Sequence, residues 1–204
     1  MRLFAPLLFL VITISCNSSK NVESNGLVGK SSTKGSSLNT NPRTQPLYRA
    51  TTELTWDLIH TNLVVSFNFK TEQVLGDAIL KLSPHFYAKK TLSLDAKAFD
   101  IKEVRVLNDS NNPVNYEYTG EKLNLTFSKT LSSNDTLELF IKYIANPNEV
   151  EERSGKAIRG GQGLYFINAQ NNIPGKPLQI WTQGEIDFSS CWFPTMDEPN
   201  QKTT

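Results

Sequence analysis

Residues 123–143 read LNLTFSKTLSSNDTLELFIKY, and this stretch decides the fold class. Apolar side chains occupy alternate positions before and after the polar cluster 132–135, namely Leu123, Leu125 and Phe127, then Leu137, Leu139, Ile141 and Tyr143. Alternation with a period of two places these side chains on one face of each strand. Because Ser, Asn and Asp favour turns, the stretch predicts two strands joined by a short connection.

Similar short apolar runs recur on both sides of this stretch. They occupy residues 63–69, 78–82, 92–94, 101–106, 116–118, 164–167 and 178–182, and polar turn segments such as 108–113 separate them. No long stretch after residue 47 shows the period of an amphipathic helix. We therefore predict an all-β domain over residues 48–204, folded as an antiparallel sandwich or barrel.

The first 15 residues have the features of an export signal. Arg2 precedes an apolar run, Leu3–Ile14, which is shorter than the ~20 residues needed to span a bilayer. The run leads to Cys16, and this order resembles a bacterial lipoprotein signal, in which the peptide is cut before a cysteine that then carries lipid. An ordinary signal peptide cut nearby is the alternative. The resemblance predicts lipidation of Cys16 and a membrane-anchored protein of the bacterial cell envelope, in the periplasm or outer membrane.

Residues 16–47 are rich in Ser, Asn and Gly, and their few apolar residues follow no period. Such a segment buries too little apolar surface to offset the entropy lost when it is ordered. We predict a flexible tether that holds the following domain away from the membrane.

Charge and cysteine content argue against several classes of protein. The formal net charge is +1, which does not favour nucleic acid as a partner. Of the two cysteines, Cys16 belongs to the export signal, so no disulfide framework is predicted. The glycine-rich segment 160–163 lacks a preceding strand and a following helix, and we interpret it as a solvated loop rather than a phosphate site.

Neither a metal site nor a catalytic nucleophile is predicted for this chain. His60 and His85 are the only histidines, whereas a zinc site needs three or four protein ligands, and the motif H-E-x-x-H does not occur. We expect both histidines to be ordinary surface or core residues. Cys191 would need a histidine base to act as a nucleophile, and we expect a buried, unreactive thiol instead.

Residues 181–202 read WTQGEIDFSSCWFPTMDEPNQK and combine aromatic with acidic side chains. Glu185 follows a predicted strand and precedes aromatic residues, a setting in which a carboxylate needs a cation. From the residues alone, a binding role and a structural ion pair with a neighbouring loop are both open, and the ion pair is favoured. Asp197 and Glu198 could be paired catalytic carboxylates, but we expect them to fix the turn before Pro199.

Two segments carry a resemblance to a known family: Thr182-Gln183-Gly184-Glu185, and Phe193-Pro194-Thr195-Met196-Asp197-Glu198-Pro199 with Lys202. Together they resemble the end of the N-terminal domain of the aminopeptidase N family of zinc metallopeptidases. The family patterns are T-Q-x-E and, eight residues on, F-P-C-x-D-E-P-x-x-K, and the spacing here is the same. Segment 163–165 resembles the family's G-L-Y element, so the resemblance covers about residues 50–204. Ser190 and Thr195 stand where the family usually has Arg and Cys, and both positions are predicted to be structural.

The resemblance implies a saddle-like β domain in which Glu185 binds the α-amine of a peptide and Gln183 lines the first specificity pocket. The cleft would be shared with the protein's own catalytic domain, which would hold the zinc. We expect this chain to be truncated before that domain, to contain no catalytic residue, to bind no cofactor and to be inactive alone. The alternative is a non-enzymatic β module of the cell envelope that binds a peptide or a protein partner. The coding sequence beyond Thr204 would distinguish the two.

Overall fold

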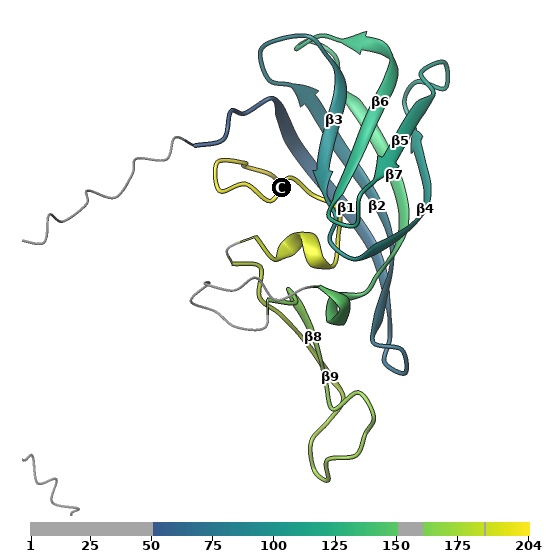
Figure 1. Cartoon of the computed structure of the whole chain (residues 1–204), viewed down its shortest axis with the longest axis vertical. Coiled ribbons are helices and arrows are strands. Elements are labelled where there is room, and N and C mark those ends of the chain that lie inside the picture. Colours follow the sequence, from purple (N-terminus) through teal and green to yellow (C-terminus); the bar gives the residue numbers. More distant parts are fainter. Residues whose placement is uncertain (1–50, 151–160, 186) are drawn as a thin grey trace, which may run out of the picture. The chain divides into compact units, whose positions relative to one another are not determined.

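The computed structural model describes residues 51–150, 161–185 and 187–204, all within the compact unit Tyr48–Thr204 (Figure 1). The predicted export signal and tether lie outside the described residues. Two of the described elements, η1 and η2, are short 3-10 helices. In chain order the elements are β1 (Trp56–Asn68), β2 (Gln73–Pro84), β3 (Lys89–Asp95), β4 (Phe99–Val106), β5 (Val114–Tyr118), β6 (Lys122–Leu131), β7 (Leu137–Ala145), η1 (Pro147–Glu149), β8 (Leu164–Ile167), β9 (Gln179–Thr182) and η2 (Ser189–Cys191).

The strands form two sheets and a separate hairpin, and every pairing between strands is antiparallel. One sheet has the order β1-β2-β7-β4, the other has the order β3-β6-β5, and β8 pairs with β9. This arrangement confirms the predicted all-β, antiparallel fold. Among the described residues, no helix is long and apolar enough to cross a membrane.

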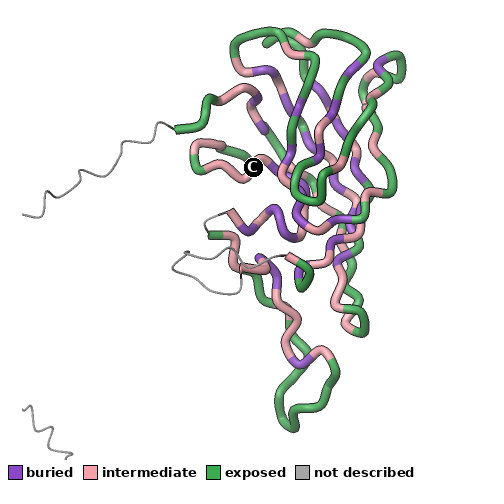
Figure 2. The backbone as a smooth tube through the Cα atoms, viewed as in Figure 1, coloured by how far each residue is buried: buried purple, intermediate pink, exposed green. Residues whose placement is uncertain are grey.

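The core lies between the inner faces of the two sheets, as the alternating pattern predicts. On the larger sheet, the register pairs Leu80 of β2 with Leu139 of β7, and both side chains are fully buried. Figure 2 shows buried residues alternating with exposed ones along these strands. Trp56, at the start of β1, packs its ring 5.9 Å from that of Phe127 on β6 and donates its indole N–H to the Thr91 carbonyl at 2.9 Å. These contacts join the two sheets where the domain begins.

Gly76 on β2 lies opposite Tyr143 on β7, and the tyrosine ring covers it. A Cβ atom at Gly76 would overlap the ring of Tyr143, so the position requires glycine. The ring also stacks on Phe99 of β4, with centroids 4.9 Å apart and an interplanar angle of 10°. Burial raises the pKa of the Tyr143 hydroxyl well above its usual range. The ring therefore packs as a core side chain across three strands.

Gly76→Ala should lower the free energy of unfolding by about 1–3 kcal/mol, because the added methyl group would push Tyr143 out of its packed position. Urea unfolding followed by tryptophan fluorescence measures this change. In a Tyr143→Leu background the same substitution should cost less, since the ring that blocks the methyl group is gone. An equal cost in both backgrounds would contradict the overlap.

Candidate functional site

The Gln183–Glu185 segment leaves β9 and forms a closed turn. The Gln183 amide donates to the Gly163 carbonyl at 2.8 Å, which extends the β8–β9 pairing by one step. The Phe188 amide then donates to the Gly184 carbonyl at 2.9 Å and closes the turn around Glu185. The Glu185 side chain is exposed, and within the described part of the chain it has neither a hydrogen bond nor an ion pair. The favoured structural ion pair is thus not found among these residues.

Gly163, at the base of β8, allows the turn to pack tightly against the hairpin. Its φ angle is +69°, in the region that favours glycine, and a Cβ atom there would overlap the carbonyl oxygen of Phe188. The backbone of the turn therefore rests directly on that of the hairpin. This contact gives a physical reason why the first residue of segment 163–165 is glycine.

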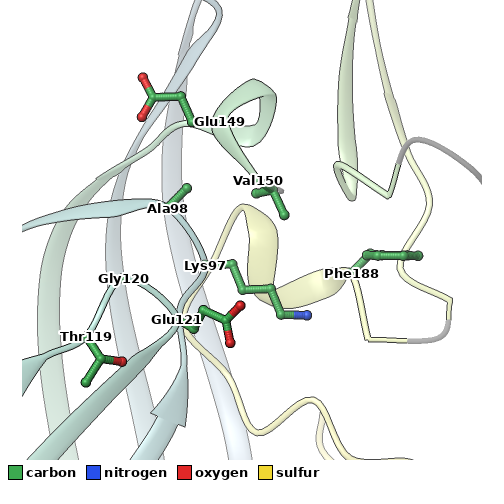
Figure 3. Close-up of a pocket in the computed structure, with 8 residues that line it drawn as sticks. All are labelled: Lys97, Ala98, Thr119, Gly120, Glu121, Glu149, Val150 and Phe188. Atoms are coloured by element: carbon green, nitrogen blue, oxygen red, sulfur yellow. The ribbon is translucent and has the colours of Figure 1, made fainter. Parts of the chain in front are cut away.

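Lys97, in the connection from β3 to β4, holds the far side of the turn. Its amide donates to the Ser190 carbonyl at 2.8 Å, and its ammonium group donates to the Asp187 carbonyl. The same ammonium lies 3.3 Å from the Asp187 carboxylate, and the lysine side chain is only 8% exposed. It also lies 5.7 Å from the centre of the Phe188 ring, toward which it extends in Figure 3. A single buried cation thus fixes the backbone on which the Glu185 turn is built.

A cavity of about 350 Å³ lies beside Lys97, lined by Lys97, Ala98, Thr119, Gly120, Glu121, Glu149, Val150 and Phe188 (Figure 3). Glu121 points toward the Lys97 side chain in this view. Phe188, whose amide closes the turn, lines the cavity, whereas Gln183 and Glu185 are not among its lining residues.

The acidic residues after the turn bind protein groups. Asp197 accepts a hydrogen bond from the Ser190 amide at 2.9 Å, and its own amide donates to the Asp95 carboxylate at 3.2 Å. Burial raises the pKa of Asp197, while the hydrogen bond from Ser190 and the charge of Lys97 act in the opposite direction. Glu198 accepts from the Thr52 hydroxyl at 3.2 Å. Asp197 and Glu198 therefore make structural contacts with other segments of the domain, and the expectation that they fix the turn before Pro199 stays a prediction.

The final segment, 195–204, is bound along β3 and β1. Asp95 and Thr195 exchange two backbone hydrogen bonds of 2.7 and 3.0 Å, and Thr195 is buried. Further on, the Gln201 amide group donates to the Trp56 carbonyl at 2.7 Å and accepts from the Leu58 amide at 3.2 Å. These contacts attach the end of the described chain to the first strand of one sheet and the first strand of the other.

The described residues do not fit a zinc site. No group of three or more His, Cys, Asp or Glu side chains among them is arranged to hold a metal ion. His85 Nδ1 lies 2.8 Å from an Asp57 carboxylate oxygen, and His60 Nδ1 lies 3.0 Å from the Thr204 hydroxyl. Cys191 is fully buried, with its Sγ 3.7 Å from the Gly161 carbonyl, as expected for a structural thiol.

Residues 58–204 match the Peptidase M1 N-terminal domain family. The chain therefore belongs to this family, and the predicted resemblance to the N-terminal domain of the aminopeptidase N family is confirmed. No curated protein matches the chain at a significant level.

Solved structures of similar fold are M1 zinc metallopeptidases and related hydrolases. An M1 zinc metallopeptidase mutant from Deinococcus radiodurans, bound to a Tyr-Ser-Ala substrate, is 18% identical with a TM-score of 0.56, covering 74% of this chain and 31% of its own. Leukotriene A4 hydrolase from Saccharomyces cerevisiae is 21% identical with a TM-score of 0.55, and the match covers 80% of this chain and 25% of its own. At these identities the likeness supports the fold alone. This chain spans about a third or less of the length of these proteins.

Lys97→Met should lower the free energy of unfolding by about 2–4 kcal/mol, because it removes the buried ammonium group that lies 3.3 Å from the partly buried Asp187 carboxylate. It should also speed hydrogen exchange at the Phe188 amide, which closes the turn. The matched control is Lys142→Met, which breaks the exposed pair with Asp77 and should cost about 1 kcal/mol or less. Equal losses in urea unfolding for the two variants would show that Lys97 does not hold the turn.

Proposed function

We propose that this chain is the N-terminal β domain of a zinc metallo-aminopeptidase, and that it contributes recognition of the substrate's α-amine. Glu185 would pair with the protonated amine at the end of a peptide, and Gln183 would line the pocket for the first side chain. Membership of the M1 N-terminal domain family supports the class of enzyme. The observation that carries the residue assignment is the exposed Glu185 carboxylate, without a partner in the described structure, on a turn fixed from both sides.

The chemistry of exopeptidases suits this arrangement. Such an enzyme must distinguish the end of a chain from an internal bond, and the end carries a positive charge that the internal bond lacks. A carboxylate at a fixed position pairs with that charge and thereby sets which peptide bond reaches the reacting centre. Asp187, two residues beyond Glu185, cannot serve in the same way because it is already paired with Lys97.

The zinc in this proposal belongs to a separate catalytic domain of a longer protein. Such a domain would supply H-E-x-x-H and a further glutamate as ligands, and its metal would activate water for attack on the peptide bond. The described residues of this chain offer no comparable ligand set. In the proposal, they bind and orient the substrate's amine end and take no part in the hydrolytic step.

Glu185→Gln in the longer protein should reduce kcat/KM on a free-amine dipeptide by roughly 30-fold to several-thousandfold. This range corresponds to the about 2–5 kcal/mol lost when one partner of a buried charge pair is removed. Zinc content should not change, since Glu185 is not a ligand in the proposal. A cleft that stays open to water would reduce the loss to less than about tenfold.

The matched control is Glu117→Gln, which removes an exposed carboxylate on β5 and should leave kcat/KM unchanged. N-acetylated peptides should be poor substrates for the wild type and should lose little more in Glu185→Gln. Wild-type kcat/KM in Glu185→Gln would refute the assignment. It would leave the alternative of an envelope module that binds a peptide or protein without hydrolysing it.

We also propose that the protein is anchored in the bacterial cell envelope through lipid on Cys16. The apolar run that leads directly to this cysteine supports the proposal. Cells grown with a labelled fatty acid should yield labelled wild-type protein in the membrane fraction, and Cys16→Ala should yield unlabelled protein. Wild-type protein without label would rule out the lipid anchor.

A further inference from the structure

The connection between β2 and β3 presents two aromatic side chains to solvent. Phe86 is 73% exposed and Tyr87 is 72% exposed, the highest values among the large hydrophobic side chains of the described residues. After Ala88, Lys89 and Lys90 begin β3. We name residues 85–90 the aromatic–basic loop. Two neighbouring aromatic rings this exposed are costly in water, which points to a surface that covers them.

The base of the loop is firmly held, so the exposure of its rings belongs to the fold. Pro84 is buried at the end of β2, and the His85 amide donates to the Thr55 carbonyl at 3.1 Å. His85 Nδ1 lies 2.8 and 3.0 Å from the two carboxylate oxygens of Asp57. The His85 ring also lies against Phe86, with centroids 3.9 Å apart. The anchored histidine thus supports the projecting aromatic side chains.

We propose that the aromatic–basic loop binds the surface of an anionic phospholipid bilayer. The rings of Phe86 and Tyr87 would enter the interfacial region, where aromatic side chains with a polar tip are favoured. Lys89 and Lys90 would lie at the level of the lipid phosphates, which attract basic residues next to an inserted apolar group. The loop combines an apolar tip with adjacent positive charge. This combination suits an anionic bilayer, which offers both an apolar layer and negative phosphates, better than it suits an uncharged protein surface.

The position of the loop in the domain agrees with this partner. The hydrogen bond from His85 to Thr55 places the loop beside the first described residues, where the chain enters the domain. β1 has 13 residues and so spans about 40 Å. Its far end contacts the β8–β9 hairpin, since the ring centroid of Phe67 lies 6.5 Å from that of Phe166 in an edge-to-face arrangement. A bilayer at the loop would therefore leave the hairpin that leads to Gln183 and Glu185 on the aqueous side.

The test measures binding to sedimented vesicles by a shortened chain that begins at residue 17. This chain lacks Cys16 and so carries no lipid, and it keeps the compact unit that contains the whole described core. Circular dichroism and a cooperative thermal transition establish that each variant is folded. We expect binding to vesicles of phosphatidylethanolamine and phosphatidylglycerol that weakens as salt is added. Absence of binding to these vesicles at low salt would overturn the proposal.

Removal of the rings tests the role of the loop itself. Phe86→Ser with Tyr87→Ser should lower the vesicle partition coefficient at least about tenfold. The matched control, Tyr116→Ser with Ile173→Ser, removes two other exposed apolar side chains and should leave binding unchanged. Equal binding by wild type and the loop variant would overturn the proposal. So would self-association of the wild type, seen by light scattering and lost in the loop variant, because it would make the loop a protein contact.

Removal of the lysines tests the charge. Lys89→Gln with Lys90→Gln should lower binding to the anionic vesicles by about 30-fold and leave the weaker binding to phosphatidylcholine vesicles unchanged. Lys70→Gln with Lys176→Gln removes the same charge elsewhere and should have little effect. An equal loss for both pairs would mean that net charge rather than the loop drives binding, and would overturn the proposal.

Discussion

The contact of Lys97 with the backbone of residues 187–190 is the interaction on which the candidate site depends. Lys97 follows β3 directly, and two residues earlier Asp95 pairs with Thr195 through the backbone. The segment between Asp187 and Thr195 is therefore fixed at one end to the last residue of β3 and at the other end to the connection that follows β3. Because the contacts use Asp187 and Ser190, they hold the turn without occupying Glu185. Rigid support beside an unpartnered carboxylate is what a charge-recognition site requires.

The carboxylates near the turn divide into two groups by what they contact. Asp95, Asp187 and Asp197 all accept hydrogen bonds or ion pairs from protein groups. Because burial raises the pKa of Asp197, its contribution to stability is present at low pH and is lost as pH rises through the folded-state pKa. The hydrogen bond from Ser190 and the nearby Lys97 offset part of that loss at neutral pH. Glu185 stands apart as the exposed carboxylate that the described residues leave unpaired.

Much of the fold could be predicted from the sequence, because the alternation of apolar and polar residues along a strand is a local signal. Leu123, Leu125 and Phe127 lie on one buried face of β6, and β7, the strand after the turn, presents its own buried face from the other sheet, between β2 and β4. The motif that includes Glu185 also located the candidate turn.

Lys97 could not be found from the sequence in this way, since it lies 90 residues from Asp187 and sits in a short connection without any periodic pattern. Its importance comes from tertiary contact alone. The same holds for the exposed rings of Phe86 and Tyr87, whose exposure depends on how β2 and β3 end.

The central claim is that Glu185 receives the α-amine of the substrate. A crystal structure of the longer protein with a bound free-amine peptide tests it most directly. The account predicts the substrate nitrogen within about 3 Å of a Glu185 carboxylate oxygen, with the Lys97–Asp187 contact intact beneath the turn. A substrate amine bound elsewhere, with Glu185 paired to a cation of the protein, would contradict it.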